Sequence, residues 1–362
     1  MRVAREELLR CLESVQAGLS PRDIIEQSSC FVFKEGKIYT YDDEVACRGP
    51  SPLDESFVGA VPHEKLLKVL QKLPEEHIEV SIEEGQLQVL GKGRKATFRL
   101  EADIVLPIDS IEEPGEWRPL HDSFAEAVQM VQHCAGRDDS QFAMTCLHLT
   151  KDHIEACDNF QVCRWAMPTG LTQEVLVRQQ AIKHIVSLGM HEVSEGESWL
   201  HFRNQAGLML SCRHYLEDFP EVGKVLGVEG KATNLPKALT EAASLASLFS
   251  SENKLEDQVL VEIRPGKLRI TGVGISGSYQ ETKKLVYHGK PIKFYIAPEL
   301  LADLVKRHSE CIITPTRLKA DTGAYQYVAC LRVPETKSKA PERNGVSEET
   351  PVKKRKKAVK ED

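Results

Sequence analysis

Three lysines recur on one side of an expected helix that spans residues 63–73. Lys65, Lys68 and Lys72 stand at spacings of three and four, opposite the apolar Leu66, so they share one face. Ammonium groups in such a row attract phosphate oxygens by charge, without covalent chemistry. A charged helix face is more often only a solvated face, and the pattern gains weight because it recurs on other expected helices. The further basic residues at such positions are Arg10, Lys183, Lys237, Lys306 and Arg307.

A glycine motif suggests a different chemistry. Residues 272–277 match G-x-G-x-x-G and follow an expected strand. The dinucleotide-binding form of this motif opens directly into a helix, whose N-terminus holds the pyrophosphate. Here residues 278–287 indicate another strand, so a glycine-rich hairpin is favoured over a dinucleotide-binding enzyme, which stays as an alternative.

No arrangement of residues in the sequence indicates catalysis. There is no Walker loop, no His-Glu-x-x-His and no G-x-S-x-G. Paired acids such as Asp42-Asp43 and Asp138-Asp139 adjoin expected turns, where solvated carboxylates are common. We therefore expect no enzymatic activity, no catalytic residues, no metal and no cofactor.

The elements that carry the lysines repeat three times. A strand pair with a basic turn is centred on Ile38, Ile154 and Leu268, which are 116 and 114 residues apart. That period is too long for a solenoid and matches a small whole domain. Amphipathic helices flank each strand pair at the same spacings. Their apolar faces are Leu8, Leu12 and Val15; Phe124, Val128 and Val131; Leu235, Leu239, Ala242 and Ala243; Leu66, Val69 and Leu70; Ile182, Ile185 and Val186; and Leu301, Leu304 and Val305.

Between the helices the sequence predicts short antiparallel strands. Residues 78–82 and 87–90, for example, alternate in polarity on either side of Glu84-Gly85, a turn signal. Few helices among many hairpins indicate an α+β fold. We predict three repeated domains, each with two helices and antiparallel sheets, which together form an arc. Their expected boundaries are 1–114, 115–226 and 227–334.

Composition indicates a reducing, non-membrane setting. No apolar run approaches the length of a membrane span, and charged residues near the N-terminus argue against a secretory signal. The ten cysteines include no Cys-x-x-Cys pair, so buried reduced thiols are expected. We therefore predict a cytoplasmic protein.

The last segment, 335–362, differs from the rest. Its nine basic and six acidic residues give it a charge of +3, against −10 for residues 1–334. Without a periodic apolar face, it is predicted to be a disordered basic tail.

With these features, the chain resembles the bacterial DNA polymerase sliding clamp, the beta subunit of the replicative polymerase. The resemblance covers residues 1–333 and rests on the threefold repeat, on length and on local matches. Residues 8–10 with Arg22 resemble the first helix and DNA-facing loop of that family, and residues 145–158 resemble its central hairpin. Residues 219–225, Phe-Pro-Glu-Val-Gly-Lys-Val, resemble its Phe-Pro-Asp-Tyr-Arg-Arg-Val junction.

The resemblance implies a head-to-tail homodimer whose six domains form a ring around duplex DNA. It implies a processivity factor without catalytic activity, found in a bacterial cytoplasm near the nucleoid or in a phage-infected host. A clamp-fold scaffold for repair or transcription remains an alternative. The implied DNA-binding residues are Arg10, Arg22, Lys65, Lys68, Lys72, Arg137, Lys183, Lys237, Lys306 and Arg307.

The resemblance also implies a pocket for short hydrophobic peptides of polymerase and clamp-loader subunits, between the second and third domains. The family's usual Thr-Asp-Gly-His-Arg-Leu reads Cys-Asp-Asn-Phe-Gln-Val at 157–162, and its usual Met-Pro-Met-Arg-Leu end is replaced by residues 330–333 and the tail. These departures predict an altered choice of peptide and fit a divergent or phage-encoded member. The implied pocket residues are Met144, Cys157, Asn159, Phe160, Val162, Pro220, Lys224, Val225, Val328 and Cys330.

Overall fold

A computed structural model describes residues 1–21, 24–251, 257–308 and 310–334. Over these residues one order of elements occurs three times: an edge strand, a helix, four strands, a second helix and three strands. The α+β content and the threefold repeat are therefore confirmed. The predicted tail, 335–362, lies outside the described residues.

The first repeat follows this order without interruption. Its first helix buries Leu8 and Leu12, and its second helix buries Leu66, Leu67 and Leu70. The elements are β1 (Arg2–Ala4), α1 (Arg5–Ser14), β2 (Cys30–Lys34), β3 (Lys37–Tyr41), β4 (Val45–Pro50), β5 (Gly59–Pro62), α2 (His63–Lys72), β6 (His77–Glu83), β7 (Gln86–Gly91) and β8 (Arg94–Arg99).

The second repeat differs at its second helix. The continuous helix expected around residues 182–186 is wrong, because two short helices replace it. After Lys183 the backbone hydrogen bonds span three residues, as in a 3-10 helix, and not four: Val186 N donates to Lys183 O, and Ser187 N donates to His184 O. The second short helix then ends at Gly189, which has a left-handed backbone conformation. The elements are β9 (Arg118–Pro119), α3 (Phe124–Val131), β10 (Cys146–Leu149), β11 (His153–Cys157), β12 (Gln161–Ala166), β13 (Val175–Arg178), α4 (Gln179–Ile182), α5 (Ile185–Leu188), β14 (Glu192–Glu195), β15 (Trp199–Arg203) and β16 (Met209–Tyr215).

A short helix precedes the third repeat, which otherwise matches the first. The first long helix of this repeat begins at Leu239, so Leu235 is buried in front of it and not on it. The elements are α6 (Gly223–Leu226), β17 (Ala232–Asn234), α7 (Leu239–Ser250), β18 (Val259–Arg264), β19 (Gly266–Gly274), β20 (Gly277–Leu285), β21 (Ile292–Ile296), α8 (Pro298–Arg307), β22 (Glu310–Ile313), β23 (Arg317–Asp321) and β24 (Tyr325–Cys330).

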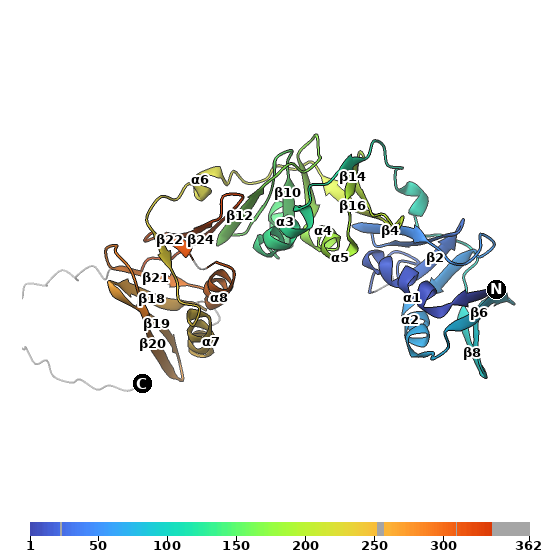
Figure 1. Cartoon of the computed structure of the whole chain (residues 1–362), viewed down its shortest axis with the longest axis horizontal. Coiled ribbons are helices and arrows are strands. Elements are labelled where there is room, and N and C mark those ends of the chain that lie inside the picture. The colour runs from blue at the N-terminus through green and yellow to red at the C-terminus, as the bar shows by residue number, and fades with distance from the viewer. Residues whose placement is uncertain (22–23, 252–256, 309, 335–362) are drawn as a thin grey trace, which may run out of the picture.

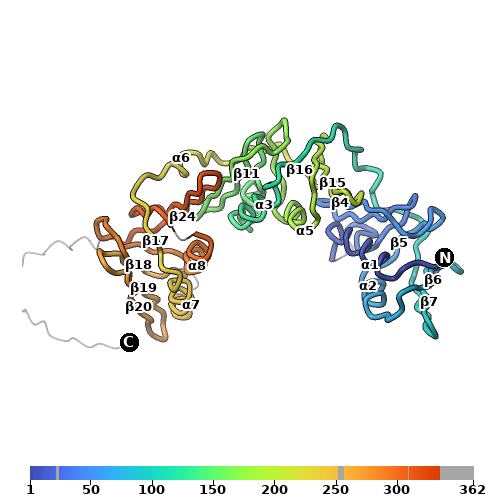
Figure 2. The backbone as a smooth tube through the Cα atoms, viewed as in Figure 1, coloured from blue at the N-terminus to red at the C-terminus, as the bar shows by residue number. Residues whose placement is uncertain are grey.

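The repeats are arranged as an open arc (Figure 1). Helices α1 and α2, α3 to α5, and α7 and α8 lie along its concave side, and the sheets form the outer layer. Figure 2 shows that the two ends of the arc are formed by the β6–β8 and β18–β20 regions. None of the described helices is both long and apolar enough to cross a membrane.

Antiparallel strand pairing joins one repeat to the next. β4 of the first repeat pairs with β16 of the second, and β12 of the second pairs with β24 of the third. Each joint thus unites the fourth strand of one repeat with the last strand of the following repeat. The outer sheet is therefore continuous through the arc, and β8 and β20 are left as outermost strands of the two terminal sheets.

The predicted repeat anchors occupy the core. Ile38, Ile154 and Leu268 each have 0% of their surface exposed, on β3, β11 and β19. All ten cysteines are free, and eight are buried, which agrees with the expected reduced thiols.

Candidate nucleic-acid interface and interdomain pocket

The predicted DNA-binding residues that the structure describes are all exposed. Most belong to the helical layer on the concave side of the arc, which brings together residues from three separate repeats (Figure 1). Arg22 lies outside the described residues. The nine that are described are Arg10, Lys65, Lys68, Lys72, Arg137, Lys183, Lys237, Lys306 and Arg307.

Helix α2 has the clearest basic face. Its apolar side is buried in the domain core, so the side with Lys65, Lys68 and Lys72 must face outward. Lys68 pairs with Glu64 one turn earlier, and this exposed contact adds little to stability because solvent screens it. Among the described residues, no carboxylate lies within ion-pair distance of Lys65 or Lys72, so both ammonium groups are available to an external anion.

Two of the predicted residues sit differently from the expectation. Lys237 is not on the first helix of the third repeat: Leu239 N bonds Pro236 O at 2.8 Å, so Lys237 lies in a turn before α7. Lys183 lies between α4 and α5 and not within a continuous helix. Both side chains remain exposed beside the helical layer.

Helix α8 presents both signs of charge near the joint between the second and third repeats. Arg307 Nη1 approaches Met130 Sδ of α3 at 3.7 Å. Glu299 and Asp303 are earlier on the same helix and line the same cavity as Arg307. Contacts of mixed sign make this helix a weaker anion surface than α2.

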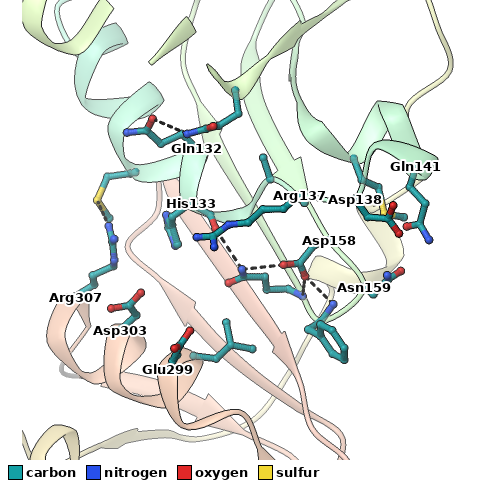
Figure 3. Close-up of a pocket in the computed structure, with 18 of the residues that line it drawn as sticks. Gln132, His133, Arg137, Asp138, Gln141, Asp158, Asn159, Glu299, Asp303 and Arg307 are labelled. Atoms are coloured by element: carbon teal, nitrogen blue, oxygen red, sulfur yellow. Dashed lines mark hydrogen bonds between the residues drawn. The ribbon is translucent and has the colours of Figure 1, made fainter. Parts of the chain in front are cut away.

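A cavity of about 1030 Å³ opens between α8 and the second repeat. Figure 3 shows Glu299, Asp303 and Arg307 on one side, with His133, Arg137 and Asp158 across from them. Arg137 therefore lines this cavity from a loop. Met144, Asn159 and Phe160, three of the predicted peptide-pocket residues, line it as well.

A half-buried histidine, His133, lies at the joint between the second and third repeats, and a buried one, His201, lies beside the joint between the first and second. Burial, with a contribution from the Arg307 charge, lowers the pKa of His133 to about 4, and its ring stacks on Tyr327 with centroids 6.1 Å apart. Burial also lowers the pKa of His201 to about 4, and its Nδ1 lies 2.8 Å from Ser211 Oγ on β16, which pairs with β4. Both rings are thus neutral at pH 7.

We expect acid to weaken the folded chain through these two histidines. Since their folded pKa values lie below the ordinary 6.5, the unfolded chain takes up protons first, and stability falls as the pH drops from about 6.5 towards 4. Each should cost about 2 kcal/mol between pH 7 and pH 5. Urea unfolding at both pH values measures this, and the His133→Gln/His201→Gln variant should lose less stability over the same interval. An equal loss in the variant would contradict the assignment.

The other predicted pocket residues lie in a compact apolar cluster. Cys157, Val162 and Val328 are buried, and Val162 faces Val328 across the β12–β24 joint. Val225 and Met144 pack against the cluster and stay partly exposed.

The remaining three members lie around this cluster. Pro220 lines a second cavity, and Lys224 and Cys330 are exposed. The predicted set therefore forms a buried floor and an accessible edge, not one open pocket.

Sequence reasoning missed the residues that cover this cluster. Val222, Leu226 and Val228 are buried against it, on or beside α6. Arg317 Nη1 donates to the carbonyl oxygens of Lys224 and Val225, both at 3.3 Å, which fixes α6 over β23 and β24. The i, i+4 spacing of Val222 and Leu226 was the available signal for this helical turn.

The glycine motif belongs to a hairpin. β19 and β20 pair up to Gly274 and Gly277, and no helix follows, so the helix N-terminus that dinucleotide binding needs is missing from this described segment. A Cβ on Gly272 would come 2.0 Å from the carbonyl oxygen of Ala246. Gly272 therefore permits close packing of α7 on the sheet, and the preference for a hairpin is confirmed.

Apolar side chains are exposed at the same end of the third repeat. Leu248 on α7 is 65% exposed and Ile275 at the β19–β20 turn is 92% exposed. Leu245 and Val273 are also exposed on these elements. Such a patch beside β20, whose outer edge has no partner strand among the described residues, is typical of an interaction surface.

Comparisons with known proteins identify the architecture. No protein-family model and no curated protein matches the sequence. The solved DNA polymerase III subunit beta of Pseudomonas aeruginosa matches with a TM-score of 0.78 and 18% identity, over 92% of this chain and 100% of that one. The beta subunit of Thermotoga maritima gives a TM-score of 0.80 and 17% identity, over 92% and 99%. The sliding clamp of Bartonella birtlesii, solved with griselimycin bound, gives 0.80 and 14%, over 91% and 98%. The chain therefore has the fold of the bacterial DNA polymerase sliding clamps, as its sequence resemblance implied.

Proposed function

We propose that two copies of this chain form a DNA sliding clamp, a ring that encircles duplex DNA and tethers the replicative polymerase. One observation carries the proposal: the helices of all three repeats form the concave layer of an arc, exposed basic residues lie on or beside these helices in each repeat, and β8 and β20, the outermost strands at its two ends, each have one edge without a partner among the described residues. A ring made from this arc encloses those side chains around a central hole.

The two joints inside the chain provide a pattern for the proposed third joint, between chains. β4 and β12 are equivalent strands of the first and second repeats, and β20 is their counterpart in the third. β16 and β24 are equivalent too, and β8 is their counterpart in the first repeat. Pairing β20 of one copy with β8 of another therefore repeats the rule of both internal joints.

Such pairing is head-to-tail and uses up both free edges. Two copies provide two β8–β20 joints, so the assembly closes after two chains with twofold symmetry. The exposed Leu245 and Leu248 strengthen the argument. Leu245 follows the buried Leu239 by six residues, as Met130 follows Phe124, and Met130 contacts α8 across an internal joint. Leu245 is thus placed to contact the neighbour's α2.

The charge pattern suits a protein that must slide. Residues 1–334 carry a net charge of −10, yet the concave helices present lysines. Phosphate contacts by exposed ammonium groups carry no base information, so the attraction is equal at every register along the duplex. Enclosure and not affinity then keeps the ring on DNA.

Charge reversal on α2 is expected to weaken DNA binding without unfolding the chain. In the Lys65→Glu/Lys68→Glu/Lys72→Glu variant the buried Leu66, Leu67 and Leu70 face is untouched. Log K for DNA binding decreases as log salt increases, and each lost phosphate contact should make this dependence less steep by about one. The steepness should therefore decrease by up to about three. Fluorescence anisotropy with a short duplex, over a salt series, gives the slope.

A matched control separates this local effect from net charge. Lys37, Lys151 and Lys267 are exposed on the hairpins of the outer sheets, away from the helices, and their replacement by Glu changes the charge equally. The control should bind DNA much better than the α2 variant. Equal loss in both would mean that α2 faces solvent and not DNA.

We also propose that partners bind at the joint between the second and third repeats through short apolar peptides. The accessible edge formed by Met144, Phe160 and Val225 adjoins the cavity of about 1030 Å³. Polymerase and clamp-loader subunits are the proposed ligands. Because the matching structures come from bacteria, a bacterial cytoplasm is the proposed setting.

A further inference from the structure

Two histidines and a glutamate converge on the second repeat, away from the helical layer. His148 on β10 is the register partner of Glu155 on β11, and His153 lies two residues before Glu155 on the same strand. Side chains two apart on a strand share a face, and so do direct partners on neighbouring strands. The sheet thus places all three together.

The ligand atoms of these residues are within reach of one ion. His148 Nδ1 lies 2.8 Å from Glu155 Oε1, and His153 Nε2 lies 3.5 Å from the same oxygen. All three atoms lie within 4.8 Å of one another. Tetrahedral zinc with bonds of about 2.0–2.1 Å needs ligand atoms roughly 3.4 Å apart, so small side-chain rotations suffice.

Neighbouring groups already orient the ligands. Arg164 donates from Nε and Nη2 to Glu155 Oε2, both at 2.7 Å, which leaves Oε1 to face the histidines. Thr150 Oγ1 lies 2.9 Å from His153 Nδ1, so Nε2 of that ring points to Glu155. Hydrogen-bonded outer groups of this kind hold metal ligands in place.

The surroundings favour a divalent cation. The cluster lies in a cavity of about 450 Å³, and Glu174 Oε2 stands 3.6 Å from His148 Nε2. Further carboxylates line the same cavity: Glu217, Asp218 and Glu221. With Glu155 these carboxylates outnumber Arg164, the one arginine among the described residues that line the cavity, so acidic side chains predominate around the cluster.

We propose that His148, His153 and Glu155 form a binding site for a transition-metal ion, of which Zn²⁺ is the best match. Imidazole nitrogens with one carboxylate suit Zn²⁺, whereas Mg²⁺ and Ca²⁺ prefer oxygen ligands. The fourth position is open to water or to Glu174. The proposal is independent of DNA binding.

The site has a physical connection to the joint between repeats. The His148 ring stacks on Phe219, with centroids 4.8 Å apart and planes inclined by 24°. Phe219 belongs to the segment that leads into Val222 and α6, which cover the apolar cluster. Fixing the His148 ring by a metal therefore also restrains the segment beside the proposed peptide edge.

Titration of the tag-free, metal-stripped protein with Zn²⁺ tests the site. Calorimetry should give one site per chain, and Zn²⁺ should raise the melting temperature while Mg²⁺ does not. His148→Ala and His153→Ala should each weaken binding at least about tenfold, because each removes one ligand. Arg164 still pairs with Glu155 in both, so the fold is retained, as melting without metal will show.

Controls exclude other zinc ligands. His77→Ala removes an exposed histidine on β6 and should bind Zn²⁺ like the parent. All titrations use a Cys330→Ser background, since Cys330 is the exposed thiol. Glu155→Gln keeps the shape of the side chain but removes its charge, and it should also weaken binding. Absent Zn²⁺ binding, or equal binding in the parent and both histidine variants, would overturn the proposal.

Discussion

The chain carrying Ala96→Cys on β8 and Glu281→Cys on β20 is expected to oxidise to a covalently closed dimer. Both positions lie within strands that remain at the ends of the sheets. By hairpin register from the repeat anchors, Glu281 corresponds to Cys47 and Cys163, whose side chains face inward at the two internal joints. Ala96 is partly buried on the inward face of its strand, beside Val89. Non-reducing gel electrophoresis measures the yield.

The strand register allows a neighbouring pair of positions, so a second variant completes the test. Ala96→Cys with Tyr279→Cys uses the next inward residue on β20, and one of the two variants should cross-link in high yield. Ala96→Cys with Gln280→Cys is the matched control, because Gln280 lies between them and points to the other face. Cys330→Ser is included throughout, because that thiol is exposed. Monomers in all variants would contradict the ring.

Closure should have a large effect on DNA retention. A ring that is oxidised around a nicked circular duplex cannot leave it, so it should stay bound at salt concentrations that release the reduced ring. Cutting the circle once gives the ring a free end, and the cross-linked protein should then slide off. Gel filtration of the protein–DNA mixture before and after cutting distinguishes enclosure from tight binding.

The periodic part of this fold could be predicted because it is local. Residues at equivalent places of the three strand pairs, Ile38, Ile154 and Leu268, are all fully buried. Helix faces such as Leu66 and Leu70 follow from spacings of three and four along the chain. Burial of one face also fixed which lysines of α2 are outward, without knowledge of any other domain.

Features that depend on distant partners were not predictable in the same way. Val162 and Val328 are 166 residues apart in sequence, and only the β12–β24 pairing makes them neighbours. The histidine cluster arises in the same manner, because His148 and Glu155 meet through strand register and not through a spaced motif. A search for clustered cysteines could not find it.

Local backbone hydrogen bonds explain why two helices begin or end at other residues than the sequence predicted. Periodicity alone treated residues 182–186 as one helical face, but Gly189 and the short bonds after Lys183 tighten and end the turn. Lys237 follows Pro236, whose carbonyl oxygen accepts from Leu239, so the helix starts later than its apolar pattern. Spacing predicts a face, whereas the start and end of a helix depend on these individual hydrogen bonds.

The residues of the predicted peptide pocket are partly covered by residues that the sequence did not point to. The buried Val162 and Val328 form a floor, and Val222 and Leu226 cover it. What stays accessible is the edge, where Phe160 is 57% exposed and Met144 and Val225 are partly exposed. The proposed peptide would therefore have an aromatic side chain and two aliphatic ones to pack against, beside a large cavity.

Replacing Val225 or Phe160 with Asp is expected to abolish peptide capture while leaving the ring intact. The ligand would have to desolvate the new carboxylate, at a cost of several kcal/mol, which weakens binding by about 100-fold or more. Neither side chain is fully buried, and both lie away from β8 and β20, so folding and dimerisation should persist. Surface plasmon resonance with immobilised peptides from polymerase and clamp-loader subunits measures the loss, and ultracentrifugation checks the dimer.

A matched substitution tests whether the effect belongs to this edge. Val58→Asp introduces the same charge at an exposed valine of the first repeat and should leave peptide binding unchanged. Loss with Val225→Asp but not with Phe160→Asp would confine the ligand to the apolar cluster, and the opposite result would confine it to the cavity. Undiminished binding in both variants would place the partner site elsewhere. If only peptides from repair or transcription proteins bind, the scaffold alternative would be favoured over a replicative clamp.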